Sequence, residues 1–358
     1  MPARQTALVG SHPFPIRAVA REAGVSTATV DRVLNGRGGV RSVTAARVKR
    51  AIAELERRQE AFELGGRSFT LDLVMQAPRR FTSAVWDAFE DTVPAVHPAA
   101  FTIRPHLTER VDPSAIADTL DTIAARGTHG VVLKAPDTAE VLAAVDRLVA
   151  DGVAVLTIVT DVSTSRRHAY VGLDNRAAGA TAAYLIGRWH STAVDERPLR
   201  VLLAVSSERF AGEEQRVEGF RSTATRLGPA WIIDQLSETE GLDTLISRDR
   251  DELDVLAAAG PIDAVYSIGG GNRALLDVLD RHDNRPSVFI AHDLDGDNRA
   301  LLGAGAISAV LHHDLRADAT RALRLVMQVH GAVPGSPQTE PAPVHVITPY
   351  NIPSLSLR

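Results

Sequence analysis

The chain contains no cysteine among its 358 residues. This absence excludes a disulfide framework and a thiolate metal site, and it is compatible with a reducing compartment. No apolar run reaches membrane-spanning length, and the short run at residues 7–10 is far shorter than the core of a signal peptide. We therefore expect a cytoplasmic protein without a membrane partner.

Several signatures of enzymes are also missing. The chain has no Gly-x-Ser-x-Gly elbow, no Walker phosphate loop and no His-Glu-x-x-His pair. Histidines and aspartates gather at residues 292–293 and 312–314, but they offer no pair of ligands spaced one helical turn apart. The sequence therefore predicts neither an enzyme nor a bound metal or cofactor.

Charge is divided unevenly along the chain. The formal net charge is -5, but residues 1–60 carry 11 Lys and Arg against 5 Asp and Glu, a net charge of +6. Residues 61–358 therefore carry a net charge of -11. The length of 358 residues predicts two or three domains, of which the first is basic. A module of this charge can neutralise phosphates, and its affinity for DNA should fall steeply with salt.

Residues 16–40 have the pattern of two short helices joined by a tight turn. The apolar positions of the first helix recur at a helical period and share one face: Ile16, Val19, Ala20 and Ala23. Gly24 tolerates the left-handed torsions that the end of this helix requires. Ser26 is a suitable N-cap for a second helix, whose buried side would be formed by Val30, Val33 and Leu34.

The outward side of this second helix predicts contact with DNA. Its side chains are mostly short and polar, so they can approach base edges closely: Thr27, Ala28, Thr29 and Arg32. A helix of this kind lies in the major groove, with its N-terminal residues closest to the bases. The sequence therefore predicts a helix-turn-helix that binds a double-stranded DNA operator.

The segment AREAGVSTATVDRVLNGRGGV, residues 20–40, resembles the DNA-binding headpiece of the lactose-repressor (LacI/GalR) family nearly residue for residue. The resemblance implies a transcriptional regulator of the repressor type, and we add Asn35 and Arg37, which follow the second helix, to the expected DNA contacts. Asp31 stands where the family usually has a serine that touches a phosphate. A carboxylate near a phosphate costs about 1 kcal/mol even in water, so Asp31 should turn away, pair with Arg32 or shift the docking.

The connector after the headpiece also has a counterpart in this family. There, a short hinge helix inserts a leucine into the minor groove as a wedge. The resemblance places Leu64 at the wedge, although the preceding LERRQE lacks the usual tyrosine-proline-asparagine pattern, and a plain solvated linker is the alternative. We expect the headpiece at residues 1–60 and the hinge at residues 61–68.

Beyond residue 68 the chain alternates between strand-like and helix-like segments. The expected strands are residues 69–75, 100–105, 130–133, 154–159, 170–173, 200–205, 231–235, 264–268, 287–291 and 308–311. The expected helices are residues 115–125, 139–150, 177–189, 217–227, 273–281 and 317–329. This alternation predicts parallel sheets with helices on both faces, and so many strands are better divided between two sheets.

The segment AYVGLDNRAAGATAAYLIGRW, residues 169–189, again resembles the repressor family, where the chain enters the second lobe of its sensor. The expected fold is an all-α helix-turn-helix headpiece plus an α/β periplasmic-binding-protein-like sensor of two doubly wound parallel-sheet lobes. Within the sensor, residues 69–358, we expect residues 69–168 and 314–338 in lobe 1 and residues 169–313 and 339–358 in lobe 2.

Ligands of open parallel sheets bind outside the carboxyl ends of the strands, and a cleft between two lobes collects such ends from both. Polar or aromatic residues that follow the expected strands are therefore the candidate effector contacts: Gln76, Phe81, Asp161, Arg216, Asn272, Asp293 and His313. Their donors, acceptors and aromatic ring suit a polyhydroxylated small molecule. The family resemblance supports Arg216, Asp293 and His313 in particular.

Two alternatives for the ligand stay open. Sugars and sugar acids are the family's usual effectors, but the same polar set fits a nucleobase or nucleoside. The glycines at residues 269–271 follow an expected strand, open a helix and fit the Gly-x-Gly-x-x-Ala fingerprint, with Asp293 about 20 residues further on, as in NAD-dependent oxidoreductases. No catalytic acid-base pair accompanies this fingerprint, so the glycines are read as a backbone cradle at the cleft.

The expected assembly is a homodimer. One recognition helix reads too few base pairs for operator specificity, whereas a twofold pair reads both half-sites of a near-palindromic operator. The tail at residues 349–358 has no heptad pattern that would join dimers, and a tetramer is left open.

Overall fold

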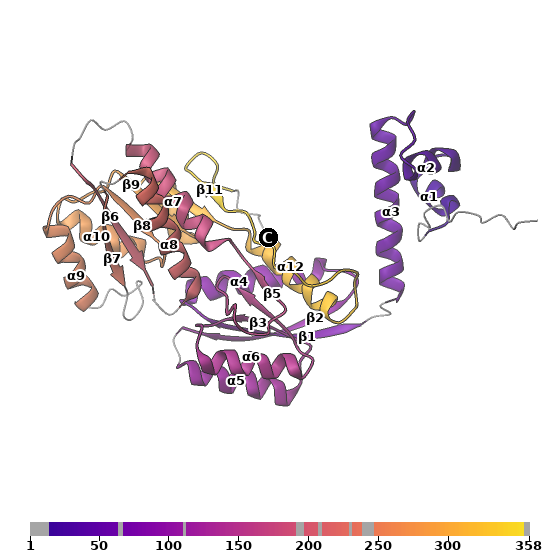
Figure 1. The fold of residues 1–358 in the computed structure, drawn as a ribbon, viewed down its shortest axis with the longest axis horizontal. Helices are drawn as coiled ribbons and strands as arrows, with labels where there is room; N and C mark the ends of the chain where they lie inside the picture. The colour runs from indigo at the N-terminus through magenta and orange to yellow at the C-terminus, as the bar shows by residue number, and fades with distance from the viewer. Residues whose placement is uncertain are drawn as a thin grey trace, which may run out of the picture. The chain divides into compact units, whose positions relative to one another are not determined.

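The computed structural model describes residues 14–63, 67–109, 112–190, 197–206, 210–228, 231–237 and 247–353. The chain divides into two compact units (Figure 1). The first unit ends at Ser68 and takes in residues 97–100, and the second unit contains the rest. Within the described ranges, the structure has no helix whose length and apolarity would allow it to cross a bilayer.

The first unit contains α1 (Ile16–Ala23), α2 (Thr27–Leu34) and α3 (Ser42–Glu63). Its small core joins Val19 of α1, Val30 of α2 and Val48 of α3, which are fully buried. Ile16 does not belong to this core as expected: it is 38% exposed, because it occupies the first position of α1 at the edge of the bundle. α3 also continues to Glu63, past the boundary that the sequence placed at residue 60.

Gly24 makes the turn between α1 and α2, as predicted. Its backbone is left-handed, with φ 59° and ψ 42°, and its N–H returns to the last carbonyls of α1. Ser26 caps α2, since its Oγ accepts a hydrogen bond from the N–H of Thr29 at 3.2 Å. Arg47 of α3 donates to the carbonyl of Ala23 at 2.7 Å and so fixes the turn to the third helix.

The first lobe of the second unit is a sheet with helices on both faces (Figure 1). The strand order is β2-β1-β3-β4-β5, and the pairs β1/β3, β3/β4 and β4/β5 are parallel. Its elements are β1 (Ser68–Gln76), α4 (Arg79–Thr92) followed by the short 3-10 turn η1 (Val93–Ala95), β2 (Ala100–Thr108), α5 (Pro113–Arg126), β3 (Gly130–Lys134), α6 (Ala139–Ala150), β4 (Ala154–Ile158), β5 (Ala169–Val171) and α12 (Leu315–Val329). β3 and β4 are buried along their whole length, because α5 and α6 cover one face of the sheet and α4 and α12 cover the other.

The second lobe repeats this plan. Its strand order is β11-β10-β9-β8-β6-β7, and all pairs are parallel except β10/β11. Its elements are α7 (Asn175–His190), β6 (Leu199–Val205), α8 (Ala211–Leu227), β7 (Trp231–Ser237), α9 (Ser247–Ala258), β8 (Ala264–Ser267), α10 (Asn272–Arg281), β9 (Val288–His292), α11 (Gly296–Gly303), β10 (Ala309–His312) and β11 (His345–Ile347). α7 and α8 pack on one face of the sheet, and α9, α10 and α11 pack on the other.

The chain passes between the lobes after β5, after β10 and again between α12 and β11. Two of these segments run side by side, because Ala342 donates to the carbonyl of Gly172 at 2.7 Å and bridges to Leu173. β5 pairs with β4 in the first sheet. The expected boundary between the lobes at residue 169 is therefore wrong, and the chain enters the second lobe only after Val171.

The expected strands and helices are all present, but some elements were missed. β11 has only three residues, too few to show an alternating pattern, and it is the antiparallel exception in the second sheet. α4 was missed because Thr82 and Thr92 occupy buried positions, which weakens its apolar stripe. Phe81 therefore lies in the first turn of a helix rather than on a loop. α9 and α11 present few buried apolar side chains and were also missed.

Candidate functional site

The exposed side of α2 and the loop after it form the candidate DNA interface. The side chains that are exposed there are Thr27, Ala28, Arg32, Asn35 and Arg37. Thr29 is only half-buried, and its hydroxyl lies 2.9 Å from the hydroxyl of Ser26. Leu64, the predicted wedge, lies outside the described residues. The remaining predicted contacts thus share one helix and its following loop.

Asp31 pairs with Arg37 rather than with Arg32. One carboxylate oxygen lies 3.1 Å from Nη1 of Arg37, and the other accepts from Nδ2 of Asn35 at 2.8 Å. The side chains of Arg37 and Asp31 are 67% and 39% exposed, and an ion pair in such a position contributes about 1 kcal/mol or less. Asp31 therefore engages two of the predicted DNA contacts, and a phosphate can compete for Arg37.

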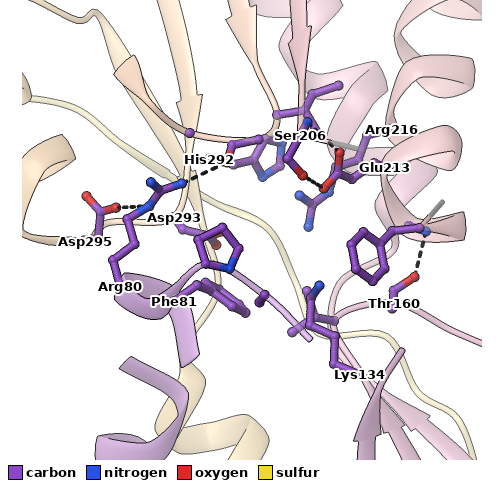
Figure 2. A pocket seen from close by; sticks show the side chains of 18 residues that line it. Arg80, Phe81, Lys134, Thr160, Ser206, Glu213, Arg216, His292, Asp293 and Asp295 are labelled. Atoms are coloured by element: carbon purple, nitrogen blue, oxygen red, sulfur yellow. Dashed lines mark hydrogen bonds and ion pairs between the residues drawn. The ribbon is translucent and has the colours of Figure 1, made fainter. Parts of the chain in front are cut away.

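The candidate effector site lies within the second unit, in a cavity between its two lobes. Residues from the carboxyl ends of strands in both sheets line a space of about 650 Å³, counted with its open mouth. The polar and aromatic side chains among these lining residues are Arg80, Phe81, Lys134, Thr160, Ser206, Phe210, Glu213, Arg216, His292, Asp293 and Asp295 (Figure 2).

Among the predicted effector contacts, Phe81, Arg216 and Asp293 line this cavity. The others do not: Gln76, Asp161, Asn272 and His313. Gln76 is buried under the cavity, where its backbone carbonyl accepts from Nζ of Lys134 at 2.9 Å. Asp161 is held by Arg167 through hydrogen bonds of 2.6 and 2.5 Å, so it orders the loop after β4.

The other two predicted contacts, Asn272 and His313, lie outside the lining of the cavity. Asn272 is buried and donates to Oδ1 of Asn298 at 2.6 Å, behind the glycine loop. His313 lies on the crossover after β10, where its Nδ1 is 2.6 Å from Asp318 of α12 and its Nε2 is 3.6 Å from Asp293. A polar residue after a strand therefore was not by itself sufficient to identify a cavity contact.

Arg216 is positioned by close packing of α7 against α8. A Cβ added at Gly179 of α7 would lie 1.9 Å from the carbonyl oxygen of Arg216, so only glycine allows the two helices to approach this closely. Arg216 is 5% exposed, and its Nε donates to Oδ1 of Asn175 at 2.8 Å. Its guanidinium extends from α8 into the cavity (Figure 2).

His292 ends β9 and Asp293 follows it, and both line the wall of the cavity. Burial and the nearby charge of Arg216 hold the pKa of His292 well below its ordinary value, so its ring is neutral at pH 7. Its Nε2 is 2.6 Å from the hydroxyl of Tyr266, while its Nδ1 has no partner among the described residues. Oδ1 of Asp293 likewise has no hydrogen-bond partner among them.

Burial lowers the pKa of His313, but the hydrogen bond to Asp318 and the charge of Asp293 outweigh it. The pKa of His313 therefore lies above its ordinary value. Its ring lies between the carboxylates of Asp318 and Asp293. It also connects the second lobe with α12 of the first.

Backbone strain concentrates at the cavity. Among the described residues, three that are not glycine have a positive φ: Val159, Asp283 and Asp293. Val159 (φ 69°) and Asp293 (φ 62°) both line the cavity. A β-branched residue in this region is strained, and such strain tends to occur at binding sites.

The glycine loop after β8 faces Arg80 of the other lobe. Nη2 of Arg80 donates to the carbonyl of Gly269 at 2.9 Å, and its Nε lies 3.2 Å from Asp295. A Cβ at Gly270 would lie 1.9 Å from Arg80, so the loop needs glycine to accept this side chain. Contact between the lobes therefore accounts for Gly270, whereas Gly269 packs closely against Ser206 of its own lobe and Gly271 has a left-handed backbone.

The sequence missed several lining residues. Lys134 ends the apolar run GVVLK of β3, and His292 ends VFIAH of β9, so both looked like parts of buried strands. Ser206 follows β6 in the same way as the predicted residues follow their strands, and this signal could have found it. Arg80 lies in the unrecognised α4, and nothing in its local sequence indicates a contact with the opposite lobe.

Comparisons with known proteins agree with this architecture. Residues 74–332 match the family of periplasmic binding protein domains, and residues 15–57 match the family described as bacterial regulatory proteins, lacI family. No curated protein sequence matches the chain.

Solved structures share the fold of the second unit. A glucose-galactose binding protein from Geobacillus stearothermophilus is 18% identical, with a TM-score of 0.67 over 80% of this chain and 99% of that chain. A solute-binding protein from Burkholderia graminis in complex with D-arabinose is 17% identical, with a TM-score of 0.69 over 82% and 99%. A candidate LacI transcriptional regulator from Bacteroides fragilis is 16% identical, with a TM-score of 0.65 over 80% and 98%.

A helix-turn-helix joined to a two-lobed ligand-binding domain defines a ligand-responsive DNA-binding regulator. The matched families comprise regulators and binding proteins rather than enzymes. The chain belongs to the lacI family of bacterial regulatory proteins, with a periplasmic binding protein domain as its larger part.

Proposed function

We propose that the chain is a cytoplasmic transcriptional repressor that binds a near-palindromic operator as a homodimer and is controlled by a small polar effector, such as a sugar or sugar derivative. The observation that carries the proposal is the cavity between the lobes. The side chain of Asp293, which is 25% exposed, lines it together with the rings of Phe81 and Phe210, and such rings can stack on the apolar face of a sugar.

The position of the cavity supports a mechanism of control. Lys134 and Phe81 come from the first lobe, and Arg216 and Asp293 come from the second, so a molecule bound between them stabilises one arrangement of the lobes. An effector that prefers this arrangement changes DNA affinity by its coupling free energy, typically about 1–3 kcal/mol or about 5–150-fold.

The exposed side of α2 supports the proposed DNA contacts. Thr27 and Ala28 lie at its N-terminal end, where a recognition helix meets base edges, while Arg32 and Arg37 offer charge to phosphates. A dimer would carry two recognition helices, one for each half-site of the operator. The test is the mass of the full chain in solution, which should be about twice 38.3 kDa.

The effector is tested with a panel of sugars, sugar acids and nucleosides, by thermal shift on the full chain. Binding of operator DNA, selected from random sequence, is then measured by fluorescence anisotropy with and without each compound that stabilises the protein. Arg216→Ala should abolish the response and leave DNA binding intact. Arg221→Ala, an exposed position on the same helix, is the matched control.

A normal response in the Arg216→Ala variant would contradict the proposed site. If a nucleoside changes DNA binding and no sugar does, the proposed effector becomes a nucleoside and the rest of the proposal is unchanged. If no compound of the panel binds, the effector part of the proposal fails.

A further inference from the structure

Lys134 is an unusual residue in this chain. Of the 39 Lys and Arg residues, only Lys49 and Lys134 are lysines. Lys49 is exposed on α3, whereas Lys134 is 7% exposed at the end of β3 and projects into the cavity (Figure 2). A buried ammonium group is costly unless it is paired, so the partners of Lys134 decide what it does.

The described residues satisfy Lys134 only in part. Its Nζ donates to the carbonyl of Gln76 at 2.9 Å and lies 3.6 Å from the centre of the Phe210 ring. An ammonium group has three donors, and a carbonyl and a ring face leave it without a carboxylate contact. At least one donor is therefore available to a molecule in the cavity.

Arg216 faces the same cavity from the other lobe. Its Nε is bonded to Asn175, and the described residues give its terminal nitrogens no hydrogen bond. Arg216 and Lys134 are close enough for the charge of one to disfavour the charge of the other. Together they form a donor-rich region contributed by both lobes.

The carboxylates that line the cavity have partners of their own, although the charges of Glu213 and Asp293 also act on Lys134. Glu213 accepts hydrogen bonds from both the N–H and the hydroxyl of Ser206. Asp295 is paired with Arg80. Oδ1 of Asp293 is directed to His313, but the side chain is 25% exposed and lines the cavity, so its carboxylate can still accept from hydroxyl groups. The cavity therefore combines a donor-rich region with an acceptor-rich one.

We propose that the effector is an anionic polyhydroxy compound whose carboxylate or phosphate group is held between Lys134 and Arg216, with hydroxyl groups directed to Asp293. This inference rests on the proposed function, because it names the chemical class of the same effector. An anion in this position contacts both lobes, and it removes the mutual repulsion of the two cations. A neutral sugar would leave that repulsion in place.

The protonation of Lys134 is consistent with an anion site. Burial lowers its pKa to about 8; Glu213 and Asp293 oppose this effect, and Arg216 adds to it. An anion bound against the ammonium group favours its charged form and raises the pKa again. The amine of Lys134 thus reports directly on the charge of whatever occupies the cavity.

The first experiment measures the affinity of the full chain by isothermal titration calorimetry for matched sets of compounds. Each set contains a neutral aldose, its aldonate, its uronate and its terminal phosphate ester, for glucose, galactose and arabinose. We expect an anionic member to bind about tenfold or more tightly than its neutral parent. The aldonate and uronate arms distinguish a carboxylate ligand from a phosphate ligand.

The second experiment tests the lysine. Lys134→Met keeps an unbranched side chain as far as Cε and removes the charged amine. It should weaken binding of the preferred anion by about 30-fold or more, while neutral sugars change little. Lys134→Arg should restore part of the affinity. Lys49→Met should leave it unchanged.

The third experiment needs no variant and covers the case in which Lys134→Met does not fold. Isotope-labelled lysine gives only two side-chain NMR signals, and Lys49 serves as the internal reference. Addition of the anion should move the pKa of Lys134 toward that of a free lysine, about 10.4, and leave the signal of Lys49 in place.

Several results would overturn the inference. The inference fails if neutral aldoses bind as tightly as their acids and phosphates. It also fails if the Lys134→Met variant binds the anion with unchanged affinity. Either result would leave the proposed function standing. Absence of binding by every anionic member also rejects the inference. If the neutral sugars and nucleosides fail as well, the proposed function loses its effector.

Discussion

Arg80 is the side chain of α4 that connects the first lobe with the second across the cavity. Its guanidinium donates to the carbonyl of Gly269 at 2.9 Å and lies 3.2 Å from Asp295. The side chains of Arg80 and Asp295 are 23% and 18% exposed, so water screens this contact only in part. We predict that Arg80→Ala shifts the lobes toward a more open arrangement.

The magnitude follows from the two interactions. A hydrogen bond from a charged donor contributes about 1.5–3 kcal/mol, and a partly exposed ion pair contributes about 1 kcal/mol or less. Solvation of the freed groups in the open form offsets part of the sum, which leaves about 2 kcal/mol. A change of this size alters the ratio of the two arrangements by about 30-fold.

The absence of cysteine makes the assay direct. Spin labels on Asp118→Cys in α5 and Glu252→Cys in α9, both exposed, report the distance between the lobes by pulsed electron resonance. The Arg80→Ala variant should add a population at longer distance and bind the effector more weakly. Arg79→Ala, an exposed neighbour on the same helix, should do neither. A distance distribution and affinity that Arg80→Ala leaves unchanged would refute the role of this contact.

Other predictions concern stability, positioning and DNA binding. Asp72 is fully buried, and its carboxylate lies 2.6 Å from the guanidinium of Arg104. Burial raises the pKa of Asp72, but hydrogen bonds from Arg104 and other side chains outweigh this and lower it. Asp72→Ala should therefore lower the free energy of unfolding, measured by urea denaturation, by about 2–4 kcal/mol. Because its folded pKa is lowered, this stability is present above about pH 4 and is lost as the pH falls through the folded pKa; an acid unfolding curve as steep in the variant as in the wild type would count against this. Gly179→Ala should displace α8 and weaken effector binding, while Gly228→Ala, which meets no atoms, should not affect effector binding in the same titration. Asp31→Ser should strengthen binding to random DNA and steepen the slope of log affinity against log salt concentration by about one unit. An unchanged slope would show that Asp31 lies away from the phosphates.

Local pattern predicted most of the fold. The turn after α1 needs a left-handed backbone, which Gly24 tolerates, and Ser26 caps α2 by accepting from the N–H of Thr29, three residues later. Both features therefore depend only on short segments of sequence. Strands such as β3 and β4 were visible because helices on both faces require apolar residues throughout. The boundary between the lobes was misplaced because β5 follows β4 across a long loop, and only the pairing of Ile158 with Val171 shows which sheet it joins.

The effector site was predictable only in part, for a related reason. Strand ends identify the edge of each sheet, and among the residues predicted in this way Phe81, Arg216 and Asp293 line the cavity. The direction of each side chain depends on partners that are distant in the sequence: Asp161 turns to Arg167, and His313 turns to Asp318. Lys134 was hidden because a charged residue at the end of an apolar strand looks like the end of the core.

Linkage between the two sites tests the central claim most directly. The affinity of the full chain for its selected operator is measured by anisotropy with and without saturating effector, and the affinity for effector is measured with and without operator at the same salt concentration. The account predicts one factor of about 5–150-fold in both directions. Operator affinity that is the same with the effector bound as without it would contradict the account.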